Sequence, residues 1–149
     1  MTSRLRCTSR NLWRNRSLVV EAAKALTLAS IAIRLLPFRK VMDAAGAENP
    51  RAPRHAGDAS AEISRVRWAI DACARRLPWR IVCFQKGLAL HKLLQRRGIS
   101  TTLHYGVAQD SERGLTAHVW VTHRGEAIIG GDEAVGYTCL ASYPSVAQH

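Results

Sequence analysis

The sequence predicts an α+β fold, in which helices come first and an antiparallel sheet follows. Up to Gly98, apolar residues recur at spacings of three and four, which is the helical period. From Ile99 onward they alternate with polar residues, which is the period of a strand. A chain of 149 residues with 47% hydrophobic and 22% charged residues fits a globular protein that buries a core, not a disordered one.

Residues 1–43 are expected to form a basic, helical N-terminal region. Nine of the first 40 residues are basic, and only Glu21 is acidic. Residues 17–36 predict one strongly apolar helix, with Ser17 as its N-cap and Pro37 as its end. Its apolar spacing indicates a buried face, and a helix lying on a membrane surface is the alternative. The residues of that face are Leu18, Ala22, Ala25, Leu28, Ala29, Ala32 and Leu35.

The charge of the chain points to the kind of partner it has. It carries 22 basic and 11 acidic residues, which gives a net charge of +11. This excess favours an acidic partner, an anionic membrane surface or nucleic acid, with a solvated basic face as the ordinary alternative. The sequence has no helix-turn-helix or base-stacking motif, so we do not expect a nucleic-acid partner.

The cysteines indicate neither a metal site nor secretion. Cys7, Cys73, Cys83 and Cys139 are scattered, without a CxxC pair or zinc spacing, so no metal and no cofactor are expected. Cys73 and Cys139 are expected to be buried and inert, and Cys7 is expected to be exposed and without a role. No apolar run reaches the roughly 18 residues that span a bilayer. We therefore expect a cytoplasmic protein with reduced thiols, with association at a membrane surface left open.

Residues 44–60 contain glycine and proline punctuators and predict a linker, which separates the N-terminal region from a domain over residues 61–149. A second helix is expected to begin at Ser60 and end at the Leu-Pro-Trp sequence before Arg80. A third helix is expected over residues 80–98. The expected strands are 101–108, 116–122 and 126–130, joined by turns at 109–115 and 124–125.

Cys83 stands at the start of the third expected helix. Backbone N–H groups and the helix dipole at such a position favour a thiolate, the nucleophilic form of cysteine. The same N–H groups can stabilise the oxyanion that forms when a thiolate attacks a peptide carbonyl. The ordinary alternative is a small buried side chain, which is the commonest state of a free cysteine.

A cysteine nucleophile needs a base, and the base needs an acceptor that orients it. His118 lies in the second strand, where alternation places it on the same sheet face as Trp120. Asp132 follows the next strand, and the hairpin length can bring it beside His118; Glu133 is the alternative acid. Taken singly, His118 is explained as a strand histidine and Asp132 as a turn carboxylate. Together they predict a catalytic triad of Cys83, His118 and Asp132.

Three further residues are weaker candidates. Gln85 is a possible oxyanion donor, but a solvated place in the first turn of the helix explains it better. His91 follows Cys83 on the same helix, about two turns away, so it is a poor base. His104 is an alternative base in the first strand, on the face opposite Leu103.

The segment WRIVCFQKGLALHKLLQRRGISTTLHYGVAQD, followed by GLTAHVWVTHRGEAIIGGDE, resembles the processing protease of lasso-peptide biosynthesis. That protease is a papain-like branch of the transglutaminase-like superfamily. The resemblance covers about residues 60–143, and the earlier LLPF sequence and the RLPW segment share it. Its most specific parts are Cys83 opening a leucine-rich helix, RRGI before the LHYGV strand, and AHVW around His118. Phe84 in place of leucine and AHVW in place of AHAW are small departures from the family.

The resemblance implies a Cys-His-Asp protease that removes the leader from a ribosomally made precursor, after which a separate ATP-dependent cyclase closes the core peptide. In this family a small recognition domain grips the leader. Residues 1–60 are too short and too helical to contain that domain, so we expect it in a separate partner chain. The N-terminal basic helices are expected to dock this partner, the cyclase or a membrane. Two other functions stay open: acyl transfer to an amine, and a non-enzymatic basic adaptor that binds an acidic peptide or a membrane.

Overall fold

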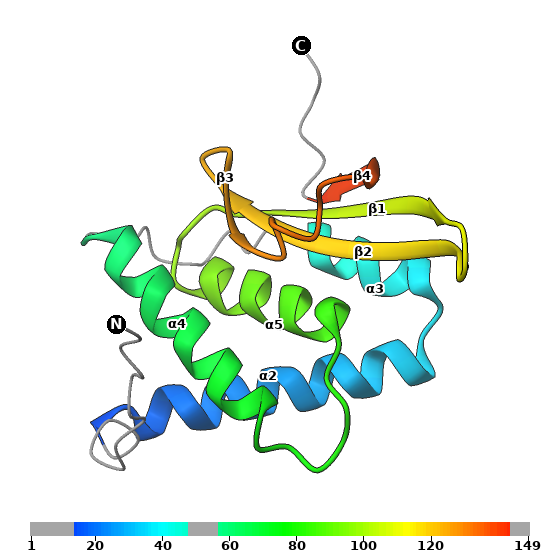
Figure 1. Cartoon of the computed structure of the whole chain (residues 1–149). Helices are drawn as coiled ribbons and strands as arrows, with labels where there is room; N and C mark the ends of the chain where they lie inside the picture. The colour runs from blue at the N-terminus through cyan, green and yellow to red at the C-terminus, as the bar shows by residue number, and fades with distance from the viewer. Residues whose placement is uncertain (1–13, 48–56, 144–149) are drawn as a thin grey trace, which may run out of the picture.

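The computed structural model describes residues 14–47 and 57–143, in which the helices lie on one side of a sheet (Figure 1). In this part of the chain four helices precede four strands, so the predicted α+β class is confirmed. In chain order the elements are α2 (Arg16–Leu35), α3 (Phe38–Gly46), α4 (Ala59–Ala74), α5 (Cys83–Arg96), β1 (Thr102–Asp110), β2 (Gly114–His123), β3 (Glu126–Ile129) and β4 (Thr138–Tyr143).

The described strands form one antiparallel sheet in the order β3-β2-β1-β4. β1 and β2 pair along their length, with Gly106 opposite His118 and Leu103 opposite Val121. The predicted strands match β1, β2 and β3 to within a few residues at their ends. β4 is not predicted, because its short sequence has no clear alternation; it pairs with the outer edge of β1.

Helix α2 packs against α4 and α5. Its Leu18, Ala22 and Leu26 share one core with Ile70 of α4 and Leu94 of α5. The N-terminal region and the predicted protease domain therefore bury apolar surface against each other. None of the helices within residues 14–47 and 57–143 has the length and apolarity needed to cross a bilayer.

The buried face of α2 differs from the predicted one. Leu28 and Leu35, expected in the core, are 60% and 76% exposed, whereas Leu26 is fully buried. Almost every position of this helix is apolar or small, so the spacing of its apolar residues did not decide which side faces the core.

Helix α3 is not predicted from the sequence. Its buried residues are Val41, Met42 and Ala45, and so short a helix gives little periodic signal. It ends at Gly46, inside the range expected to be a linker.

Helix α4 begins at Ala59, close to the predicted Ser60. The Asp58 side chain caps it by accepting a hydrogen bond from the Ser60 backbone N–H at 3.0 Å. Both ends of the expected linker 44–60 are thus helical, and its residues 48–56 lie outside the described part of the chain. The division into domains stays a prediction.

Candidate active site

Cys83 is the first residue of α5, as the sequence predicts. The backbone of Val82 before it is extended, so the helix begins at the cysteine, whose side chain is half-buried. The N–H groups of the first helical turn have no acceptor within the helix and point beyond its end. A helix start of this kind can stabilise an oxyanion that forms beside it.

Gln85 holds the beginning of this helix. Its side-chain oxygen accepts a hydrogen bond from the backbone N–H of Val82 at 2.7 Å. The side chain is buried, so the expectation of a solvated glutamine is wrong. A glutamine three residues after the N-cap can reach back to the N-cap N–H, so Gln85 fixes the helix start. Its amide nitrogen, the group that could donate to an oxyanion, instead lies 3.5 Å from the Ser30 hydroxyl.

Gly87 lies one turn after Cys83 and lets α5 approach β2 closely. A Cβ atom at this position would come within 2.9 Å of the Val119 side chain, which is closer than real Cβ contacts. Val119 follows His118 in β2. The close approach at Gly87 therefore fixes the spacing between the helix that carries Cys83 and the strand that carries His118.

His118 is buried on the sheet face that points away from the helical core. Val119 and Val121 pack into that core, so alternation turns His118 and Trp120 to the other face, as predicted. The rings of His118 and Trp120 are stacked, with centroids 6.1 Å apart and planes at 17°. The ring of Tyr137 lies 5.2 Å away on a tilted plane. These neighbours restrict rotation of the imidazole.

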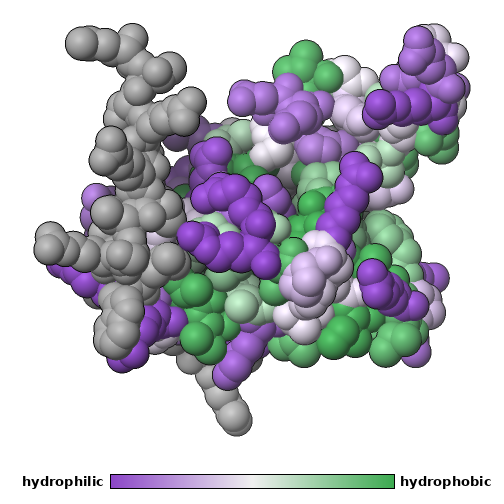
Figure 2. Space-filling view, turned by 60° about the horizontal axis from the view of Figure 1, so that its bottom comes forward, coloured by the Kyte–Doolittle hydropathy of each residue, from purple (hydrophilic) through white to green (hydrophobic). Residues whose placement is uncertain are grey.

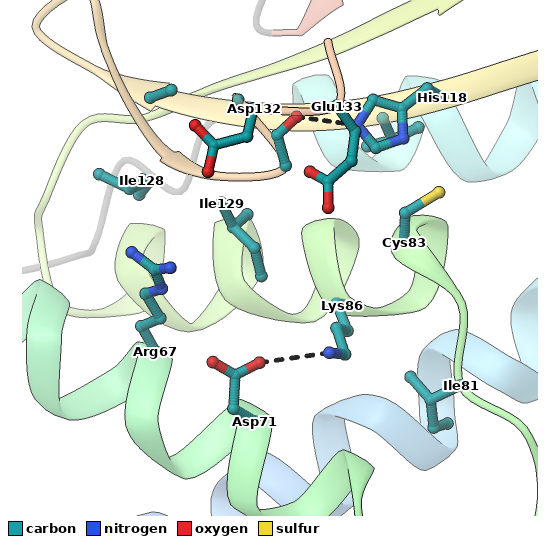
Figure 3. A pocket seen from close by; sticks show the side chains of 14 residues that line it. Arg67, Asp71, Ile81, Cys83, Lys86, His118, Ile128, Ile129, Asp132 and Glu133 are labelled. Carbon is teal, nitrogen blue, oxygen red and sulfur yellow. Dashed lines mark hydrogen bonds and ion pairs between the residues drawn. The ribbon is translucent and has the colours of Figure 1, made fainter. Parts of the chain in front are cut away.

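The Nε2 atom of His118 donates a hydrogen bond to the carbonyl oxygen of Gly130 at 2.8 Å. A carbonyl oxygen only accepts, so Nε2 carries the hydrogen in the neutral ring. Nδ1 is then the nitrogen that can take a proton. Figure 3 shows this second ring nitrogen on the side of the imidazole that faces Cys83.

Gly130 can offer its carbonyl in this way because it is glycine. Its φ of 72° lies in the left-handed region. A Cβ atom at this position would come within 2.8 Å of the Val119 carbonyl oxygen and 3.1 Å of His118 Nε2. Any larger residue would therefore strain the backbone and push against the imidazole.

Cys83, His118, Asp132 and Glu133 all line one pocket of about 450 Å³ (Figure 3). The structure thus brings the predicted nucleophile, base and both candidate acids around a single cavity. One wall comes from α4 and α5, and the other from β2, β3 and the segment after β3. The remaining lining residues are Arg67, Asp71, Ile81, Lys86, Val119, Ala127, Ile128, Ile129, Gly130 and Gly131.

Charged side chains stand on both walls of this pocket. On the helical wall, Lys86 Nζ lies 3.3 Å from an Asp71 carboxylate oxygen, and both side chains are about one-third exposed. Water screens such a pair, so it adds little stability. On the other wall, Asp132 and Glu133 are exposed. Within residues 14–47 and 57–143, no group of three or more His, Cys, Asp or Glu side chains is suited to hold a metal ion.

The catalytic acid stays a prediction. Within the described residues, neither Asp132 nor Glu133 is hydrogen-bonded to His118, since the Gly130 carbonyl takes the Nε2 hydrogen. Figure 3 shows the Glu133 side chain drawn between Asp132 and the imidazole. No hydrogen bond joins Cys83 to His118 in this part of the chain either, and such bonds often form only when substrate binds.

His91 has a structural role. It is fully buried, and its ring nitrogens lie 2.7 Å from the Thr101 hydroxyl and 2.9 Å from the Ala45 carbonyl oxygen. Burial lowers the pKa of His91 to about 4, so the ring is neutral near pH 7. It does not line the pocket of Cys83.

A second thiol–imidazole pair lies on the sheet, where Cys139 Sγ is 3.9 Å from His104 Nδ1. The His104 ring is already engaged: Nδ1 lies 2.8 Å from the Ser142 hydroxyl, and Nε2 lies 2.8 Å from the Thr122 hydroxyl. Cys139 is exposed, so the expectation that it is buried is wrong.

The other two cysteine expectations have different outcomes. Cys73 is buried, as expected, and burial raises the pKa of its thiol. Cys7 lies outside the described residues.

Sequence reasoning missed Gly130 and Gly87. The available signal for Gly130 was the Gly-Gly pair directly before Asp132, which is typical of a turn. For Gly87 it was a glycine inside an otherwise helical, leucine-rich segment, where glycine is unfavourable unless packing requires it. Neither signal says which side chain the glycine serves.

Comparison with protein families gives a match to a family model described as the transglutaminase-like superfamily, over residues 25–142. This range contains most of α2 and all of the described pocket residues. Comparison with curated proteins and with solved structures gives no match.

Proposed function

Since this chain belongs to the transglutaminase-like superfamily, we propose that it is a cysteine protease that removes the leader from a ribosomally made lasso-peptide precursor. One observation carries the proposal: Cys83 opens α5 in a pocket that His118 also lines. The lasso-peptide assignment is supported by the resemblance of about residues 60–143 to the processing protease of that pathway.

In the first half of the proposed reaction, Nδ1 of His118 takes the proton from the Cys83 thiol. The thiolate attacks the scissile carbonyl carbon, and the oxygen becomes an oxyanion beside the first-turn N–H groups of α5. The protonated imidazole then gives its proton to the leaving amine, and the carbon–nitrogen bond breaks. The products of this half are the free amine and a thioester on Cys83.

In the second half, His118 accepts a proton from water, which attacks the thioester carbonyl. Collapse of the intermediate breaks the carbon–sulfur bond, releases the carboxylic acid and returns the proton to the cysteine sulfur. His118 must keep one ring orientation through both halves. The Gly130 carbonyl and the stacked Trp120 ring favour that orientation.

We assign the orienting and electrostatic tasks to different groups. The Gly130 carbonyl fixes the tautomer of His118, because it holds the Nε2 hydrogen at 2.8 Å. Asp132 stays the proposed acid of the triad, with Glu133 as its alternative. Its charge on the pocket wall would stabilise the imidazolium that forms during the reaction.

We also propose which molecules this protein acts with and where it acts. The precursor peptide is the substrate, a separate leader-recognition protein presents it, and the ATP-dependent lasso cyclase receives the product. We expect these steps in the cytoplasm, where the thiol of Cys83 stays reduced.

Mass spectrometry of leader removal tests the proposal. Precursor and recognition protein are incubated with the wild-type chain, with Cys83→Ala, and with Cys139→Ala as a matched control. We expect cleavage by the wild type and by Cys139→Ala but not by Cys83→Ala. Equal cleavage by Cys83→Ala would show that another group is the nucleophile, and no cleavage by any of the three would reject the assigned substrate.

Acyl transfer to an amine is the second candidate function, and membership of the superfamily favours it. A thioester on Cys83 can be attacked by an amine instead of water. Adding a primary amine to the same assay distinguishes the two. A protease releases a free carboxylic acid at the cut site, whereas an acyltransferase gives a product heavier by the amine.

A further inference from the structure

A second concavity lies between α2 and α5, with α3 at one end. It has a volume of about 460 Å³ and shares no lining residue with the pocket of Cys83. Its α2 side is formed by Ala25, Ala29 and Ala32, and its α5 side includes Leu88 and Leu93. Ala29, Leu88 and Leu93 are buried. Ala25 and Ala32 are half-buried, and their small side chains leave room for another element to approach the backbone of α2.

Large apolar side chains stand exposed beside this groove. Leu28 and Leu36, which line it, are 60% and 47% exposed. Ile31, Leu35 and Phe38 continue the exposed surface along the end of α2 and the start of α3. Figure 2 brings the lower side of Figure 1 forward and shows hydrophobic side chains in several patches between hydrophilic ones. Large apolar side chains that stand exposed beside a concave surface indicate an interaction site.

The rim of the groove is basic. Lys24, Lys92 and Arg96 line it, and Glu21 is the one acidic lining residue. The Glu21 carboxylate is already paired, since it lies 2.8 Å from a nitrogen of Arg97. Burial, and secondarily the charge of Arg96, lower the pKa of Lys92. An approaching carboxylate would offset both effects on Lys92.

We propose that this groove binds an acidic amphipathic helix of a partner protein, with leucine-like residues against the alanine floor and carboxylates against the basic rim. Helix-in-groove recognition uses this combination of a concave apolar floor and a charged edge. The proposal concerns a surface away from Cys83 and does not depend on the proposed protease function.

Other occupants fit the groove less well. A second copy of the chain would place one basic rim against another. Residues 1–13 carry three arginines and no acidic residue, so the same repulsion applies to them. A membrane surface matches the charge, but a concave groove presents less apolar area to a flat bilayer than to a helix.

A designed peptide probes the groove directly. The probe is an 18-residue fluorescein-labelled peptide of leucine and glutamate, arranged so that the leucines form one helical face. A permuted peptide of the same composition, without that face, is the charge-matched control. Binding of each to the full-length chain is measured by fluorescence anisotropy at 0.15 M salt.

Two exposed positions provide the test variants, and two others provide matched controls. Leu28→Glu and Lys24→Glu change the groove. Leu115→Glu makes the same replacement on the β1–β2 hairpin, and Arg113→Glu makes a matching reversal of charge there. All four replaced side chains are exposed, and circular dichroism confirms that each variant folds.

We expect the amphipathic peptide to bind the wild type at least about tenfold more tightly than the permuted peptide does. Each groove variant should weaken binding of the amphipathic peptide about tenfold, or about 1.4 kcal/mol. The hairpin variants should bind as the wild type does. Equal binding of both peptides, no binding, or equal loss in hairpin and groove variants would overturn the proposal. A membrane occupant would also overturn the proposal. It would be indicated if the wild type binds phosphatidylglycerol vesicles, the groove variants do not, and the peptide does not compete with the vesicles.

Discussion

Within the described residues, Cys83 shares a pocket with a histidine and Cys139 contacts one, and the surroundings of the two thiols differ. Cys83 begins α5 and lines the pocket that His118 also lines. Cys139 lies in β4, with its sulfur 3.9 Å from His104 Nδ1. His118 gives one ring nitrogen to the Gly130 carbonyl, whereas both ring nitrogens of His104 are engaged by hydroxyl groups.

From this difference we infer that nearness to an imidazole is not sufficient to make a thiol a nucleophile. Cys83 is the first residue of α5, where backbone N–H groups have no acceptor within the helix. Nδ1 of His118 has no hydrogen-bond partner within the described residues. Cys139 is part of the edge strand β4, where backbone N–H groups lie in the plane of the sheet and are not directed to the thiol. His104 bridges β4 and β2 through Ser142 and Thr122, which is a structural task.

The largest difference should appear when each cysteine is replaced. Cys83→Ala removes the proposed nucleophile, so we expect kcat for leader removal to fall at least about 10⁴-fold. Cys139→Ala should change kcat by less than about twofold, since its thiol is exposed and lies outside the pocket. Steady-state cleavage of the precursor measures both, and a comparable loss in the two variants would remove the distinction.

Replacement of each histidine tests the same difference between the pocket of Cys83 and the surroundings of Cys139. His118→Ala removes the proposed base, and we expect kcat to fall about 10³-fold, as loss of general acid–base catalysis does. His104→Gln should cost stability through its two lost contacts, at about 1 kcal/mol each, and leave kcat near that of the wild type. Urea unfolding identifies a temperature at which both variants are folded. Cleavage assays at that temperature separate the loss of catalysis from the loss of stability.

The third prediction concerns the acceptor that orients His118. Gly130→Ala places a Cβ atom against His118 Nε2 and the Val119 carbonyl, so we expect kcat to fall about 10²-fold, as small misplacements of catalytic groups do. Asp132→Asn leaves the Gly130 bond in place and should cost less than about tenfold. Measuring kcat and KM separately is informative, because misplacement of the base should lower kcat with little change in KM.

Gly114→Ala is the matched control for this prediction. Gly114 also has a positive φ, of 76°, but a Cβ atom there meets nothing within 4 Å. It therefore reproduces the backbone strain without the contact. If Gly114→Ala and Gly130→Ala lose activity equally, or if Asp132→Asn loses more than Gly130→Ala, the carboxylate and not the carbonyl orients the imidazole.

The smallest predicted effect concerns stability and a histidine outside both pairs. The folded pKa of His91, about 4, lies below its ordinary value of 6.5, so the unfolded chain takes up the proton first as the pH falls. Stability is therefore lost between about pH 6.5 and pH 4. We expect the free energy of unfolding to fall by about 2 kcal/mol more between pH 7 and pH 5 in the wild type than in His91→Gln. Urea unfolding at the two pH values tests this, and equal changes in both proteins would contradict it.

Much of the fold follows from the sequence because its signals are local. The change of period at Ile99 separates helices from strands, and Pro37 and Gly98 mark helix ends near where the structure has them. The buried side of α2 was predicted incorrectly at Leu28 and Leu35, because a helix apolar on most sides does not identify its own core face. β4 and α3 are short, so they lack a period long enough to detect.

The candidate site was predictable where a single residue type carries the chemistry. Cys83 at a helix start and His118 on the outward sheet face follow from pattern, and the structure places both around one pocket. The role of the Gly130 carbonyl was not predictable, since a backbone acceptor leaves no mark in the identity of a side chain. Gln85 was misread because its partner is the backbone N–H of Val82, whose availability depends on where the helix begins.

The pairing of Cys83 with His118 is best tested by the rate at which each thiol reacts with iodoacetamide at pH 7. Mass spectrometry of the labelled peptides resolves the individual cysteines. Exposure alone would make Cys139 the faster thiol, since Cys83 is half-buried. We expect Cys83 to react at least about tenfold faster than Cys139, and His118→Ala to remove this advantage. Faster labelling of Cys139 than of Cys83, or a Cys83 rate unchanged in His118→Ala, would contradict the pairing of these two residues.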